Sequence, residues 1–124
     1  MSVRIPSGPS TPVPLTPANS NNFGKFAFLT PAWDWRGVKG AITSVKNQGF
    51  CGSCYAFAAV AAVESTFMIV KGTYFPNLSE QQILDCTGGL GNNGCSGGSR
   101  KKSMDYVATN GLRTETQYPY QAKQ

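Results

Sequence analysis

Histidine is absent from all 124 residues of the sequence. The imidazole side chain is the one most often used for general acid–base catalysis near neutral pH. A catalytic site built from this chain alone therefore lacks the usual general base. Any reaction that needs an imidazole would have to take it from outside these residues.

Acidic residues are also few, six against 11 lysines and arginines, which gives a net charge of +5. The cations are scattered except for Arg100, Lys101 and Lys102, and a short run of this kind is typical of a solvated surface. No basic stripe is interleaved with aromatic residues, so we predict no nucleic-acid partner. The apolar run from Ala56 to Val63 ends at Glu64, so we also predict no membrane span.

The first 27 residues contain no acidic residue and five prolines among Ser, Thr, Asn and Gly. Such a composition buries too little apolar surface to offset the entropy of ordering it, and the prolines break any helix of a transit peptide. No apolar segment follows Arg4, so we recognise no signal peptide. We predict an extended or disordered leader over residues 1–30 and a folded domain over residues 31–124.

Apolar side chains recur at near-helical spacing from Cys54 to Lys71 and predict a long, mostly buried helix. Lys71 and Gly72 provide its stop, a cation in the last turn followed by a residue that tolerates positive φ. The apolar residues that we expect in this helix are Tyr55, Phe57, Val60, Ala61, Phe67, Met68 and Val70.

Two further helices are indicated by shorter signals. Ser79 and Gln82 are spaced as a capping box, which predicts a short helix from Ser79 to about Asp85. The glycine-rich stretch 94–98 predicts a turn in which another backbone can approach closely. A third helix should follow that turn and end at Asn110, before Gly111.

Four cysteines, at positions 51, 54, 86 and 95, suit either a disulfide-bearing secreted protein or a metal or redox site. Cys54 falls at the first turn of the long helix, where the partial positive charge of the helix terminus stabilises a thiolate, the reactive form. The unpaired N–H of Cys54 and the side-chain amide of Gln48 could together hold an oxyanion.

Three other interpretations of the cysteines compete with a nucleophile. A thioredoxin-like pair of Cys51 and Cys54 would need a preceding strand, but residues 45–49 form a polar, glycine-ended segment. A zinc site with Cys86 and Cys95 lacks the short second knuckle, so we predict no metal and no cofactor. A purely structural role suits three cysteines but explains Cys54 poorly.

The segment 51–55, Cys-Gly-Ser-Cys-Tyr, resembles the signature of papain and cathepsin cysteine proteases, in which the second cysteine is the nucleophile. The resemblance extends in chain order over residues 31–124. It is carried by Asp-Trp-Arg at 34–36, Val-Lys-Asn-Gln-Gly at 45–49, Leu-Ser-Glu-Gln-Gln at 78–82, Gly-Cys-Ser-Gly-Gly at 94–98 and Tyr-Pro-Tyr at 118–120.

This resemblance implies an α+β papain-like fold. Residues 31–124 would be its mainly helical left-hand domain, with about three helices, truncated before the β-rich domain. Cys54 would attack the peptide carbonyl while Gln48 and the Cys54 N–H hold the oxyanion. The substrate-binding residues would be Gly52, Gly97, Gly98 and Ser99. Cys51 would be disulfide-bonded to Cys95, leaving Cys86 unpaired. Members of the family are lysosomal or extracellular.

Two departures from the family pattern qualify these expectations. Ser99 and Arg100 stand where relatives usually have an aromatic residue and a proline in one wall of the specificity pocket. The family's His and Asn lie roughly 130–150 residues beyond the nucleophile, which is past Gln124. We therefore expect a cysteine endopeptidase acting on peptide or protein substrates, of which this chain is the nucleophile half. Alone it would be inactive, and a histidine-bearing second half or chain would be its partner. The alternative is a non-enzymatic half-domain that serves as a binding or structural subunit.

Overall fold

The computed structural model describes residue 32 and residues 34–72 and 76–124, so the leader predicted over residues 1–30 lies outside the described residues. The described part is mainly helical, as predicted, and contains no β-strand, only an isolated bridge between Leu78 and Thr114. Its helices are α2 (Cys54–Lys71), α3 (Glu80–Cys86) and α4 (Arg100–Asn110), with 3₁₀ turns η1 (Trp35–Gly37), η2 (Gly88–Leu90) and η3 (Gly94–Ser96).

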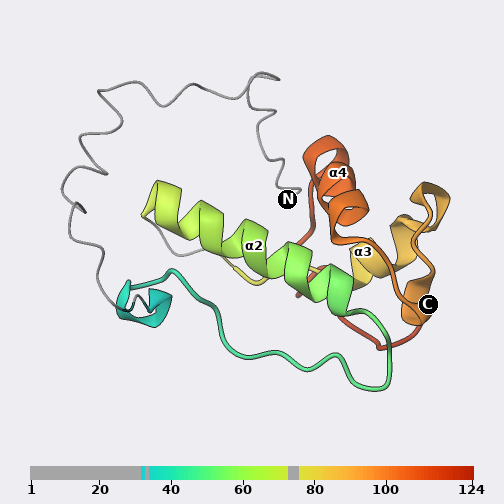
Figure 1. Cartoon of the computed structure of the whole chain (residues 1–124), viewed down its shortest axis with the longest axis horizontal. Coiled ribbons are helices and arrows are strands. Elements are labelled where there is room, and N and C mark those ends of the chain that lie inside the picture. Colours follow the sequence, from blue (N-terminus) through green and yellow to red (C-terminus); the bar gives the residue numbers. More distant parts are fainter. Residues whose placement is uncertain (1–31, 33, 73–75) are drawn as a thin grey trace.

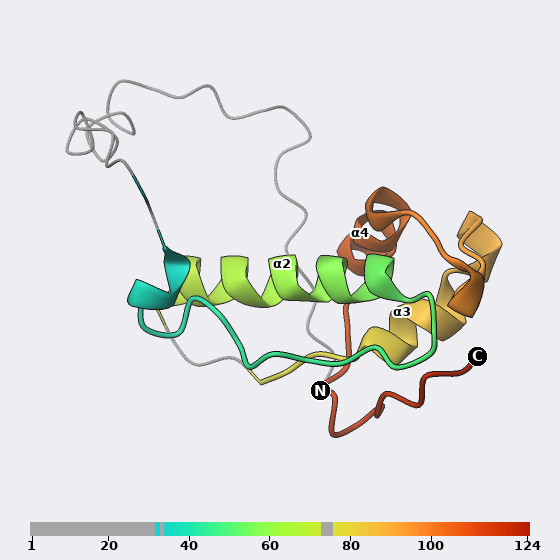
Figure 2. The same ribbon diagram turned by 60° about the horizontal axis from the view of Figure 1, so that its bottom comes forward.

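The long helix α2 is the axis of the fold, and α3 and α4 pack against its N-terminal half (Figures 1 and 2). The turn η1 lies near the opposite end of α2 (Figure 2). The largest fully buried apolar side chains come from all three helices and from the segments beside them: Tyr55, Val60, Leu78, Ile83, Leu84, Val107 and Leu112. The core therefore lies next to the start of α2, where Cys54 is placed.

The bounds of α2 match the prediction, but its burial does not. Seven of its 18 residues are buried, and they recur every three to four residues along one face. Ala61 and Val70, which we expected in the core, are exposed. The expectation of a mostly buried helix is therefore wrong in the described structure. Only one side of α2 is covered, by α3, α4 and the extended segment before Cys54.

By length and composition alone, α2 is apolar enough to cross a membrane, even with Glu64 within it. In the fold the helix forms a wall of the core, and the Glu64 carboxylate is fully buried against polar partners. A core helix of a globular domain passes the same test of length and hydropathy as a membrane span.

The helix ends follow local capping signals. Gly72 adopts φ 66°, and its N–H bonds the carbonyl of Met68, which ends α2 as predicted. Ser79 Oγ accepts the N–H of Gln82 at 3.0 Å at the start of α3. The reciprocal half of the predicted capping box is absent. The Gln82 amide instead donates to the carbonyl of Gly111 and accepts from the N–H of Arg113.

A buried ionic cluster ties the segment before Cys54 to α2 and α3. Lys46 Nζ lies 2.9 Å from Glu64 Oε1 and 2.8 Å from Glu80 Oε1. Glu64 also accepts from Thr43 Oγ1 and from the N–H of Leu78. Burial alone would lower the pKa of Lys46, but the two carboxylates outweigh burial and raise it. Burial raises the pKa of Glu80, against the opposing effect of Lys46.

Candidate active site

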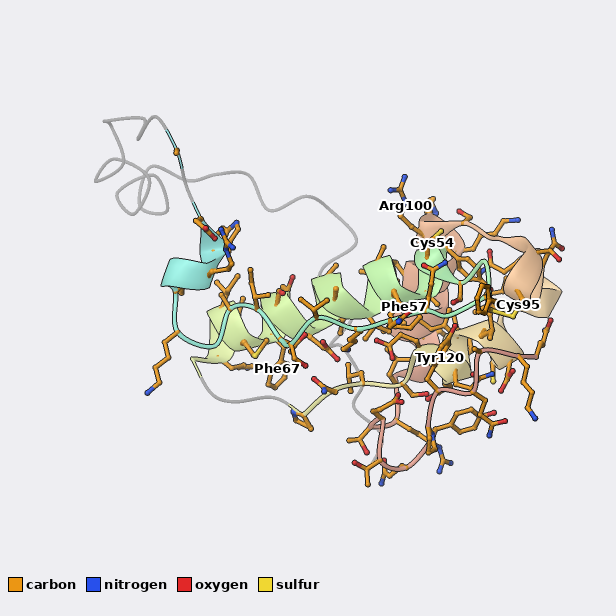
Figure 3. The ribbon with its side chains drawn as sticks, turned by 90° about the horizontal axis from the view of Figure 1, so that it is seen from below. Cys54, Phe57, Phe67, Cys95, Arg100 and Tyr120 are labelled. Carbon is orange, nitrogen blue, oxygen red and sulfur yellow. A yellow bond between two sulfur atoms is a disulfide. The ribbon has the colours of Figure 1, made fainter. Side chains whose placement is uncertain are left out.

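Cys54 is the first residue of α2, and its reduced side chain is exposed. Figure 3 shows it at the end of the molecule where α2 begins, with Arg100, the first residue of α4, on the same side. The partial positive charge of a helix N-terminus favours an anion at this position. The sequence prediction of a cysteine at the first turn of this helix is therefore confirmed.

A disulfide fixes the loop that leads into Cys54. Cys51 and Cys95 are bonded, with their Cα atoms 4.6 Å apart in space and a sequence separation of 44. The N–H of Gly52 donates to the carbonyl of Cys95 at 2.8 Å. Both links join the loop to the glycine turn that precedes α4. The pairing implied by the family resemblance is thus present, and Cys86 is free and exposed, as expected.

Gln48 lies across the same loop from the helix start. Its side-chain Nε2 donates to the carbonyl of Cys51 at 2.8 Å. A primary amide nitrogen carries two hydrogens, so one remains for a further acceptor. The backbone carbonyl of Gln48 accepts from the hydroxyl of Tyr120 at 2.7 Å. The side-chain amide of Gln48 is therefore held to the loop, and one of its N–H groups remains available to another acceptor.

The glycine turn places Gly98 against the residue that follows the cysteine. A Cβ added at Gly98 would lie 2.9 Å from Tyr55 Cε2 and 2.7 Å from Asn92 Oδ1, so only glycine allows this approach. Gly97 has φ 109°, in the region that favours glycine. Ser99 donates its N–H to Asn92 Oδ1 and accepts the N–H of Lys102, which makes it the N-cap of α4.

Two side chains that shape this site, Tyr120 and Asn92, have roles that the sequence did not indicate. Tyr120 reaches the loop from 72 positions beyond Gln48, and the sequence marks it only as part of the Tyr-Pro-Tyr stretch at 118–120 that the family resemblance includes. Asn92 holds the start of α4 through contacts with Thr87 and Ser103. Long-range contacts of this kind leave no periodicity to detect, so spacing could not have identified them.

The chemistry available here is that of a nucleophile with unused backbone donors. Among the described residues no acceptor is assigned to the N–H of Cys54 or of Tyr55. No group of three or more possible metal-ligating side chains occurs in the described part of the chain. The arrangement therefore suits attack by sulfur on an electrophile whose developing oxyanion meets N–H donors.

Comparison with known proteins identifies the same pattern elsewhere. A family model described as papain family cysteine protease matches residues 29–124. Chymopapain from Carica papaya is 53% identical over 91 residues, which cover 73% of this chain and 25% of that protein. Mexicain from Jacaratia mexicana is 50% identical over 91 residues, which cover 73% and 41%.

Solved structures agree with the sequence relatives. The bromelain protease from Ananas comosus, in complex with the E64 inhibitor, aligns with a TM-score of 0.67 at 47% identity. The alignment covers 74% of this chain and 41% of that one. The chain thus spans between 25% and 41% of the length of these three relatives.

Proposed function

Because this chain belongs to the papain family of cysteine proteases, we propose that it supplies the nucleophile of a cysteine endopeptidase. Cys54 is the nucleophile, and Gln48 with the N–H of Cys54 forms the oxyanion hole. The observation that carries this proposal is the exposed, reduced Cys54 at the start of α2, behind a disulfide-held loop.

The proposed reaction is hydrolysis of a peptide bond through an acyl-enzyme. The Cys54 thiolate attacks the carbonyl carbon, the C–S bond forms, and the carbonyl electron pair moves onto oxygen. The C–N bond then breaks, and the amine leaves with a proton from an imidazolium. Water, losing its proton to the imidazole, attacks the thioester and breaks the C–S bond. That imidazole comes from residues outside these 124, since the sequence has no histidine.

Substrate binding is assigned to the glycine turn beside Cys54. No hydrogen bond is assigned to the backbone of Gly98 among the described residues, so its N–H and carbonyl are available to an extended peptide. Gly52 and Gly97 have no side chains that would obstruct a peptide lying between Gly98 and Cys54. Ser99 and Arg100 form the polar, cationic border of the same surface. The peptide or protein substrate would lie across this face.

The compartment proposed for the protein is lysosomal or extracellular. The disulfide between Cys51 and Cys95 supports this proposal, since such bonds persist in oxidising environments. A reducing compartment would open the bond and release the loop from the glycine turn. The pairing would then no longer hold Gly52 against Cys95.

A comparison of the two free cysteines tests the proposed acyl transfer. Both Cys54 and Cys86 are exposed, so solvent access alone does not separate them. We expect p-nitrophenyl acetate to acylate Cys54 in the Cys86→Ser chain about tenfold faster than Cys86 in the Cys54→Ser chain. Release of nitrophenolate, with mass spectrometry of the thioester, measures both rates. Equal rates would count against a specialised nucleophile at Cys54.

A further inference from the structure

A serine precedes each of the three α-helices, but only two of these serines cap their helix. Ser79 and Ser99 have extended backbones, with ψ 113° and 125°, and their hydroxyls accept helix N–H groups. Ser53, before α2, has ψ 15° and makes no side-chain capping bond. The usual interaction of a serine at this position is therefore missing only at the helix that carries Cys54.

The Ser53 hydroxyl is engaged elsewhere. Its Oγ lies 2.6 Å from the Tyr120 hydroxyl, which donates its single hydrogen to the carbonyl of Gln48 at 2.7 Å. Because a carbonyl cannot donate, Ser53 must be the donor to Tyr120. The other possible acceptor, the carbonyl of Cys51, is 3.5 Å away. A chain of hydrogen bonds thus runs from Ser53 through Tyr120 to Gln48.

This arrangement leaves donors free at the start of α2. The N–H groups of Ala56 and Phe57 donate to the carbonyl of Ser53 at 2.9 and 3.3 Å. The N–H groups of Cys54 and Tyr55 have no assigned acceptor among the described residues. A capping serine accepts the N–H of the second or third helical residue, here Tyr55 or Ala56, and of these two only Tyr55 has no acceptor already assigned among the described residues.

Tyr120 is itself held in place from two sides. Its ring meets the ring of Phe57 edge to face, with centroids 4.9 Å apart (Figure 3). Its N–H donates to Glu115 Oε1 at 2.7 Å, and the N–H of Glu115 donates to the carbonyl of Asn77 at 2.8 Å. The hydroxyl is therefore fixed relative to both the loop and α2.

We propose that Tyr120 is a positioning residue that holds the Ser53 hydroxyl away from the first turn of α2. The backbone donors there stay free for the anions of the reaction, the thiolate and the oxyanion. The inference rests on the proposed role of Cys54 as the nucleophile. Its test uses alkylation rather than hydrolysis, so the two proposals can fail separately.

The test compares variants of the 124-residue chain in a Cys86→Ser background, with iodoacetamide as the probe at pH 7. Tyr120→Phe keeps the ring but releases Ser53 to cap the helix, which competes with the thiolate for the free donors. We expect Cys54 to be alkylated about threefold more slowly. Adding Ser53→Ala removes the capping hydroxyl, so the double variant should return to within about 1.5-fold of the parent. Tyr118→Phe, which loses a bond to Asp85, serves as the control and should not change the rate.

Hydrogen exchange at the Tyr55 amide gives a second readout of the same step. The amide should exchange more slowly in Tyr120→Phe than in the parent, and fast again in the double variant. An unchanged rate and exchange in Tyr120→Phe would overturn the proposal. So would slow alkylation that persists in the double variant, because a loop that is merely loosened would not recover when a second side chain is removed.

Discussion

At Gly52 the loop that carries Cys54 meets the glycine turn, backbone against backbone. The N–H of Gly52 donates to the carbonyl of Cys95, and a Cβ added at Gly52 would lie 2.5 Å from that carbonyl oxygen. Backbone atoms cannot rotate out of the way as a flexible side chain can. The glycine is thus a condition for the two segments to lie side by side.

Substituting Gly52 tests this close approach. Gly52→Ala should lower the free energy of unfolding by about 1–3 kcal/mol, since the methyl group forces the loop away from Cys95. Gly37→Ala is the matched control, because a Cβ there meets no atom within 4 Å. Urea unfolding of both variants measures the difference. Equal losses at the two positions would show that the contact at Gly52 is not tight.

The charge of Arg100 should be felt at Cys54, since Figure 3 places both residues at the same end of the molecule. We expect Arg100→Gln to lower the ratio of alkylation rates with anionic iodoacetate and neutral iodoacetamide by about twofold at low ionic strength. Salt at 0.5 M, roughly, should abolish the difference. Lys71→Gln, at the far end of α2, should leave the ratio unchanged. If both substitutions act equally, the effect is one of net charge rather than position.

At the scale of elements, the segment before Cys54 is anchored by one lysine between two buried carboxylates. Removing that lysine leaves Glu64 and Glu80 without their shared cation. Lys46→Met should therefore cost about 3 kcal/mol of unfolding free energy at pH 7. The cost should be smaller at pH 5, because Glu80, whose pKa is raised by burial, can then take up a proton.

Urea unfolding at the two pH values measures this dependence. Lys39→Met is the control, since Lys39 is exposed. A Lys46→Met cost that matches the control, or that grows on acidification, would contradict the anchoring role of the cluster.

Alkaline pH should lower the free energy of unfolding. Two carboxylates raise the pKa of Lys46 despite its burial, and burial raises the pKa of Tyr55. A group whose pKa is higher in the folded state contributes stability below its unfolded pKa and loses it as the pH rises. The free energy of unfolding should therefore be flat from about pH 8 to 9.5 and fall above about pH 10.

Urea titrations across this range, in a Cys54→Ser and Cys86→Ser background that prevents disulfide exchange, measure the slope. Tyr55→Phe should make the decline shallower, because one titrating group is gone. A decline that begins near neutral pH would point to groups other than these two.

For the molecule as a whole, the sequence predicts the features that short-range signals, such as apolar spacing and helix caps, determine. The bounds of α2 follow from apolar spacing and from Gly72, and α3 begins after Ser79 as its cap indicates. Cys54 at the first turn follows from the same reasoning. The pairing of Cys51 with Cys95 could be expected only from the family resemblance, because spacing leaves the partners of four cysteines open.

Contacts between residues far apart in the sequence could not be predicted from these local signals. The burial of α2 depends on how much of it other segments cover, which no residue of α2 encodes. Lys46 meets Glu80 across 34 positions, and Tyr120 meets Gln48 across 72. The oxyanion role of Gln48 and the substrate contacts of Gly52, Gly97, Gly98 and Ser99 stay predictions, as does the leader over residues 1–30.

The measurement that tests the central claim most directly is peptide hydrolysis by this chain with a separately made histidine-bearing segment. We predict no turnover of a fluorogenic peptide by the chain alone, and turnover by the mixture that Cys54→Ala abolishes and Cys86→Ser preserves. Association without turnover would instead favour a binding or structural subunit. Turnover by the lone chain that Cys54→Ala abolishes would contradict the claim that the base comes from outside these 124 residues.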